Sequence, residues 1–87
     1  MPTLLRVGPY RFYIVMFDCH ERMHVHVGGG GPGAAKIWLL PEVSVAASRG
    51  YTARDLERIE AIVRQHRQTL LDRWVEACEG GGSWSER

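Results

Sequence analysis

Apolar and polar residues alternate through the first half of the chain, which is the pattern of strands in a sheet. Residues 3–7 and 10–17 flank the turn dipeptide Gly8-Pro9, and this arrangement predicts an antiparallel pair. Residues 24–27 and 35–40 continue the alternation with a branched or aromatic residue at most inward positions. We therefore expect a small antiparallel sheet of four or five strands.

Two connections in this half affect the prediction. Residues 28–33 contain five glycines and one proline, so they predict a flexible hairpin loop. A phosphate-binding P-loop is excluded because no Gly-Lys-Ser/Thr sequence follows to open a helix. Val43 and Val45 alternate once more before a turn at residues 48–50. We expect a short fifth strand at residues 43–48, with a helical turn as the alternative.

From Leu56 onward the apolar spacing becomes that of a helix. Thr52 is a candidate N-cap, and Asp55 three residues later approximates a capping box. The helix should end near Cys78, before the glycines at residues 80–82. The fold class expected is α+β, a small antiparallel sheet followed by one long C-terminal α-helix. Residues 1–78 would form a single domain and residues 79–87 a flexible tail.

The length of this helix raises a packing problem. About 26 helical residues extend about 39 Å, whereas strands of about six residues extend only about 20 Å. Either the helix breaks near residues 65–68, or its far end, with Leu70 and Trp74, packs on another surface. That surface would belong to a second copy of the chain or to a partner protein.

Charge and composition exclude few classes of function. The 87 residues hold 11 Lys and Arg against 10 Asp and Glu, interspersed along the chain, so no basic segment indicates nucleic acid. Cys19 and Cys78 lack any framework spacing, which favours reduced thiols in a cytoplasmic protein, with a single long-range disulfide as the alternative. No apolar run approaches the length of a membrane span.

The densest group of reactive side chains surrounds a histidine pair. Residues i and i+2 of a strand share a face, so His24 and His26 lie side by side. His20 and Asp18 precede them by a few residues and could complete a site for a divalent metal such as zinc, with one position left for water.

A second hypothesis needs no metal. His24 and His26 would serve as base and acid in the cleavage of a phosphodiester, while Arg6, Arg11 or Lys36 holds the phosphate. A third hypothesis gives the pair a purely structural role on a half-exposed strand. The residues alone leave the three open.

An ordered series of motifs runs along the chain, namely Met1-Pro2-Thr3, Tyr10-Arg11-Phe12, His24-Val25-His26-Val27, Ala35-Lys36-Ile37-Trp38-Leu39, Gly50, Ile62-Val63, His66-Arg67, Leu70-Leu71 and Trp74. Over residues 1 to about 78 this series resembles one family, DUF4160. Family members usually carry prolines just before the paired histidines, where this chain has Arg22-Met23.

The resemblance implies a small bacterial protein, the toxin side of a toxin–antitoxin pair whose antitoxin is a DUF2442-type protein. Two functions follow as hypotheses. One is a toxin that acts on RNA through His24 and His26. The other is a non-catalytic module whose helix end binds a partner, with structural or metal-binding histidines.

Overall fold

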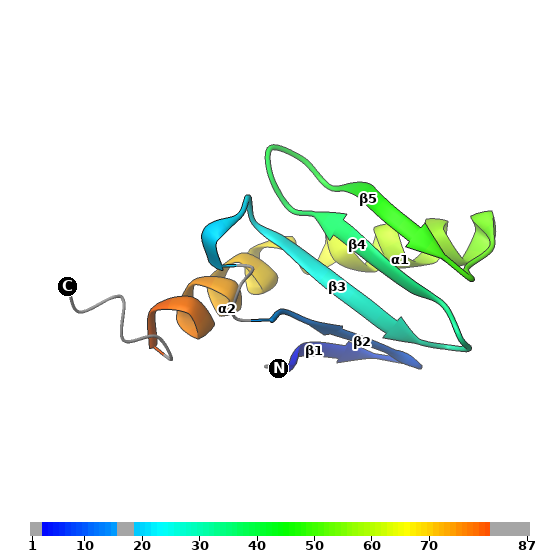
Figure 1. Ribbon diagram of the computed structural model, residues 1–87, viewed down its shortest axis with the longest axis horizontal. Helices are drawn as coiled ribbons and strands as arrows, with labels where there is room; N and C mark the ends of the chain where they lie inside the picture. Colours follow the sequence, from blue (N-terminus) through cyan, green and yellow to red (C-terminus); the bar gives the residue numbers. More distant parts are fainter. Residues whose placement is uncertain (1–2, 16–18, 81–87) are drawn as a thin grey trace.

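The computed structural model describes residues 3–15 and 19–80. Within these ranges the chain forms five strands and then two helices (Figure 1). In chain order they are β1 (Thr3–Val7), β2 (Tyr10–Tyr13), β3 (His24–Gly29), β4 (Ala34–Trp38), β5 (Ser44–Arg49), α1 (Ala53–Gln65) and α2 (Arg67–Gly80). The α+β class is confirmed.

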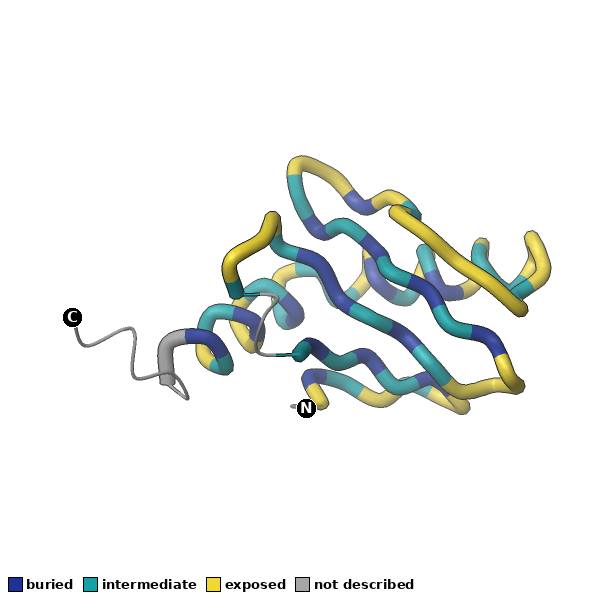
Figure 2. The backbone as a smooth tube through the Cα atoms, in the orientation of Figure 1, coloured by how far each residue is buried: buried dark blue, intermediate teal, exposed yellow. Residues whose placement is uncertain are grey.

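The five strands form one antiparallel sheet in which each strand pairs with its neighbours in sequence, in the order β1-β2-β3-β4-β5. The fifth strand is therefore confirmed, and the alternative of a helical turn at residues 43–48 is wrong. It continues through the turn expected at residues 48–50, because the chain reverses only at Gly50, whose φ of 78° suits glycine. β5 lies at the edge and is exposed along most of its length (Figure 2).

The strand register divides the sheet into two faces. Phe12 pairs with Val27, and Val25 pairs with Ile37, and all four side chains are fully buried. Both helices cover this face, as the ribbon shows (Figure 1). Apolar residues of the helices complete the core, namely Ile59, Val63, Leu70, Trp74 and Cys78.

The expectation of one long helix is wrong, and the alternative of a break near residues 65–68 is confirmed, because the chain breaks at His66 into two helices. The predicted start is confirmed: Asp55 N donates to Thr52 Oγ1 and Thr52 N donates to Asp55 Oδ2, each at 3.1 Å. The break lets α2 turn onto β1, where Arg73 Nη1 donates to the Leu4 carbonyl at 3.2 Å.

The break also explains where the far end of the helical segment packs. Leu70 is 0% exposed and Trp74 is 6% exposed, so both belong to the core of this chain. They cannot form the outward surface proposed for a partner or a second copy. The Trp74 Nε1 donor meets no acceptor among the described residues.

The two cysteines correct a second expectation. Cys19 and Cys78 form a disulfide, with their Cα atoms 5.7 Å apart and 59 positions apart in the sequence. The fold brings the segment after β2 against the last turns of α2, which spacing along the chain could not indicate. The argument for a cytoplasmic location from reduced thiols therefore fails.

The glycine-rich segment forms the β3–β4 hairpin loop, as predicted. Tyr51 packs over Gly33 so closely that a Cβ there would overlap its ring, and Tyr51 Oη donates to the Gly29 carbonyl at 2.8 Å. Burial, with smaller effects from Tyr10 and Asp55, raises the pKa of the Tyr51 phenol.

Neither helix of the described chain has the length and apolar character that crossing a bilayer requires. Residues 81–87, most of the expected tail, lie outside the described residues, so the predicted domain limits stay predictions.

Candidate functional site

The face of the sheet turned away from the helices carries most of the polar strand residues. The register places Arg6 opposite Arg11, Tyr13 opposite His26, and His26 opposite Lys36. Directly opposed residues of antiparallel strands point to the same side, and this side is opposite to that of the buried core residues. We call this side the open face.

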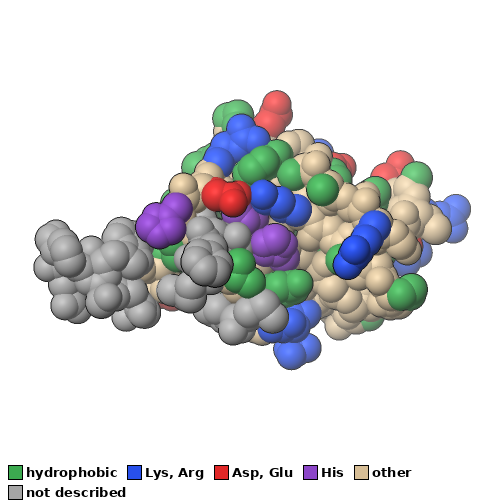
Figure 3. All heavy atoms as spheres, in the orientation of Figure 1, with side chains coloured by type: hydrophobic (Ala, Val, Ile, Leu, Met, Phe, Trp, Pro, Cys, Tyr) green, Lys and Arg blue, Asp and Glu red, His purple; other side chains and the backbone are tan. Residues whose placement is uncertain are grey.

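Charge is distributed unequally between the sheet and the helices. The strands contain four cationic residues and no acidic residue, the cations being Arg6, Arg11, Lys36 and Arg49. The helices contain five arginines and six acidic residues, namely Arg54, Arg58, Arg64, Arg67, Arg73, Asp55, Glu57, Glu60, Asp72, Glu76 and Glu79. Lys, Arg and His side chains gather over the sheet when it is viewed from the open face (Figure 3). The strands therefore add only positive charge to this side, where Glu21, from the segment before β3, pairs with Lys36.

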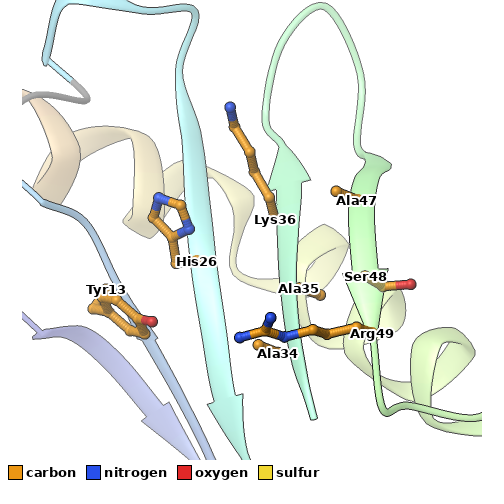
Figure 4. A pocket seen from close by; sticks show the side chains of 8 residues that line it. All are labelled: Tyr13, His26, Ala34, Ala35, Lys36, Ala47, Ser48 and Arg49. Carbon is orange, nitrogen blue, oxygen red and sulfur yellow. The ribbon is translucent and has the colours of Figure 1, made fainter.

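A shallow hollow of about 250 Å³ lies on the open face over β3, β4 and β5. Its polar lining comes from Tyr13, His26, Lys36 and Arg49 (Figure 4). Small residues of β4 and β5 leave the space between these side chains, namely Ala34, Ala35, Ala47 and Ser48. The Arg49 side chain reaches from the edge strand across Ala34 toward His26 in this view.

The two histidines stand side by side as predicted but in different surroundings. Their ring centroids are 5.1 Å apart with the planes at 85°. His24 is 0% exposed, lies edge-on to Trp38 at 5.5 Å, and its Nδ1 is 2.7 Å from the Arg22 carbonyl oxygen. A carbonyl only accepts hydrogen bonds, so His24 Nδ1 carries a proton. His26 is half-buried, stacks on Tyr13 and lines the hollow.

The cations of the open face lie against aromatic rings and other polar groups. The Arg11 guanidinium carbon lies 4.5 Å from the Tyr13 ring centroid, and Arg11 Nε donates to Thr3 Oγ1 at 2.7 Å. Lys36 Nζ lies 4.7 Å from the Trp38 centroid and forms a salt bridge with Glu21 Oε1 at 3.0 Å. These contacts restrict the long side chains before any ligand binds.

The predicted metal set is not assembled from its described members. His20 is exposed, whereas His24 is buried, and Asp18 lies outside the described residues. In residues 3–15 and 19–80, no three His, Cys, Asp or Glu side chains are close enough together to hold a metal ion. The site that the described residues do assemble is cationic.

The structure brings His26 and Lys36 together, as the phosphodiester hypothesis requires, while Arg11 lies two positions farther along the sheet. Arg49 is a site residue that the sequence reasoning missed. Arg49 pairs with Ala34, and Ala47 pairs with Lys36, so the strand register brings Arg49 to the open face, and the sequence alone does not show this register.

The comparison with protein families supports the resemblance carried by the motifs. The family described as "Domain of unknown function (DUF4160)" matches residues 10–75. The chain belongs to the DUF4160 family. The match extends from β2 into α2, so this DUF4160 region includes every residue that lines the hollow. No curated protein and no solved structure matches the chain.

Proposed function

We propose that this DUF4160 protein binds RNA on its open face and acts as the toxin of a toxin–antitoxin pair. One observation carries the proposal: all charged residues of the five strands are cationic, and two of them, Lys36 and Arg49, line a hollow beside His26. A cationic surface free of acidic strand residues attracts polyanions, and phosphate is the anion that nucleic acids present.

The dimensions of the hollow suit a phosphodiester group. Arg49 reaches into it from the edge strand, so a phosphate bound there would accept hydrogen bonds from the guanidinium, and Lys36 would add a second donor once its ammonium leaves Glu21. His26 lines the same space, with Lys36 directly opposite on β4. The arrangement offsets the charge of a phosphate and places beside it an imidazole that can donate or accept a hydrogen bond.

The proposal changes the roles of the histidine pair. Because His24 is fully buried and its Nδ1 is held by the Arg22 carbonyl, it does not contact a ligand in the hollow. Proton transfer to or from a bound phosphodiester would fall to His26 alone. This geometry favours binding over two-histidine cleavage, so RNA binding is the primary function and hydrolysis a separate question.

The partner is part of the same proposal. A DUF2442-type antitoxin would neutralise the toxin by covering the open face, since this is the surface that binds RNA. The buried Leu70 and Trp74 have no part in that contact.

A charge-reversal pair tests RNA binding. Arg49→Glu changes the hollow, whereas Arg58→Glu makes the same charge change at an exposed position of α1 on the helical side. Fluorescence anisotropy with a labelled single-stranded RNA of about 12 nucleotides gives the affinities. We expect roughly tenfold weaker binding for Arg49→Glu and less than about twofold for Arg58→Glu. Equal losses in the two variants would mean that the hollow has no special role.

Expression in bacteria tests the toxin role and separates binding from cleavage. We expect growth arrest with the wild type and relief with Arg49→Glu. If RNA binding alone causes arrest, His26→Ala still arrests growth and leaves the RNA intact. Relief by His26→Ala together with loss of RNA cleavage would instead establish hydrolysis. No arrest with the wild type would refute the toxin role and leave the binding result standing.

A further inference from the structure

The aromatic rings of the open face are already engaged within the protein. Proteins that grip single-stranded nucleic acid through its bases present aromatic rings on which the bases stack. Trp38 and Tyr13 are the described aromatic residues beside the hollow and the histidine pair. Their surroundings decide whether the open face can bind bases in this way.

Trp38 is occupied by two cations and a histidine. The Arg22 guanidinium carbon lies 3.9 Å from its ring centroid and Lys36 Nζ lies 4.7 Å away. The His24 ring meets Trp38 edge-on at 5.5 Å. A base that stacked on Trp38 would have to displace at least one of these cations and give up its attraction to the face of the ring.

Tyr13 is engaged in a similar way. The Arg11 guanidinium lies over its ring, and His26 stacks against it at a centroid distance of 5.5 Å with planes 26° apart. Stacking a base on Tyr13 would disturb the same side chains that supply charge to the open face. Both rings therefore hold cations in place.

The donors around the hollow also match phosphate better than bases. Lys and Arg side chains donate hydrogen bonds and accept none, and phosphate oxygens only accept them. Discrimination among bases requires donors and acceptors placed against base edges. Lys36 and Arg49 provide only donors at the hollow, while Tyr13 and His26, which could also accept, are stacked on each other.

We infer that the open face recognises the phosphodiester backbone of RNA without discriminating among bases, and that Trp38 is a positioning residue for Lys36 and Arg22. This inference rests on the proposed function and specifies its ligand chemistry. The toxin would then bind many RNA sequences with similar affinity.

Three oligomers of equal length and phosphate number test the ligand chemistry. They are poly(U), poly(A) and an abasic ribose-phosphate chain of about 12 units. We expect affinities within about threefold of each other and a log–log salt slope of about −2, the value for three phosphate contacts on a single strand. Binding of the abasic chain more than about tenfold weaker would overturn the inference and leave RNA binding intact. Failure of all three to bind would overturn both.

Two substitutions at one position test Trp38. Trp38→Phe keeps a ring for the cations, whereas Trp38→Leu removes it. We expect Trp38→Leu to weaken binding of all three oligomers by the same factor, about two- to fivefold, with a less steep salt slope, and Trp38→Phe to restore most of the affinity. Unchanged affinity and slope in Trp38→Leu would overturn the positioning role, as would a weakening confined to the oligomers that carry bases.

Discussion

Opening the Cys19–Cys78 disulfide should cost a large part of the stability of this fold. The bond joins residues 59 positions apart, and it ties the segment before β3 to a buried cysteine at the end of α2. In the chain-entropy description, a loop of this length restricts the unfolded chain by about 4 kcal/mol at room temperature. Small domains have total unfolding free energies of roughly 5 to 15 kcal/mol. We therefore expect the bond to supply a quarter or more of the stability.

Urea unfolding followed by circular dichroism gives the measurement, with the disulfide-bonded protein compared with the Cys19→Ser, Cys78→Ser variant. The midpoint should fall, and the m-value should rise because the unfolded chain without a cross-link exposes more surface. A Cys19→Ala, Cys78→Ala variant controls for placing a hydroxyl at the buried position of Cys78.

Two results would refute this reasoning. One is an unfolding free energy in the two variants within about 1 kcal/mol of that of the disulfide-bonded protein. The other is the titration of two accessible thiols in protein unfolded without a reductant, because the bond would then be absent.

Three further substitutions follow from contacts in the fold. Gly33→Ala should lower the melting temperature because the added Cβ would overlap the Tyr51 ring. Gly28→Ala is the control, since its Cβ would meet open space and should leave the melting temperature unchanged. Equal melting temperatures in the two variants would contradict the contact. Because the folded state raises the pKa of Tyr51, the stability that this phenol contributes is complete below its unfolded pKa of 10.0 and is lost as the pH rises above that value. In urea titrations between about pH 8 and pH 11, wild type should therefore lose more stability than Tyr51→Phe. Parallel losses would refute this. His24→Ala should destabilise the fold by about 2 kcal/mol or more, whereas His26→Ala should keep the melting temperature. The reverse order would refute the division of roles.

The elements that local pattern determines were predicted correctly. Strand alternation and the turn residues identified the sheet, and the reciprocal hydrogen bonds of Thr52 and Asp55 formed as the capping-box spacing indicated. The break at His66 was left as one of two alternatives, because its cause is tertiary. A helix longer than the sheet buries Leu70 and Trp74 only if it changes direction.

The site depended more strongly on tertiary structure. Arg6, Arg11, Lys36 and Arg49 are far apart in a sequence with almost balanced charge, so composition indicated no basic surface. Strand register places them all on one face, while the acidic residues concentrate in the helices. The disulfide has the same origin, because neither cysteine has a local signal that indicates its partner.

The H-x-H motif shows how neighbouring strands give two identical residues different roles. Both histidines point to the open face, and both have an aromatic ring directly across the ladder. Trp38 lies across from His24, which is fully buried, whereas Tyr13 and Lys36 flank His26, which is half-buried at the hollow. The face that joins them carries positive charge without acidic strand residues, so under the proposed function a ligand would reach His26 and the neighbouring cations while His24 keeps Trp38 in place. In that proposal the motif is one structural histidine beside one ligand-facing histidine, and the ligand that suits its surroundings is a phosphate.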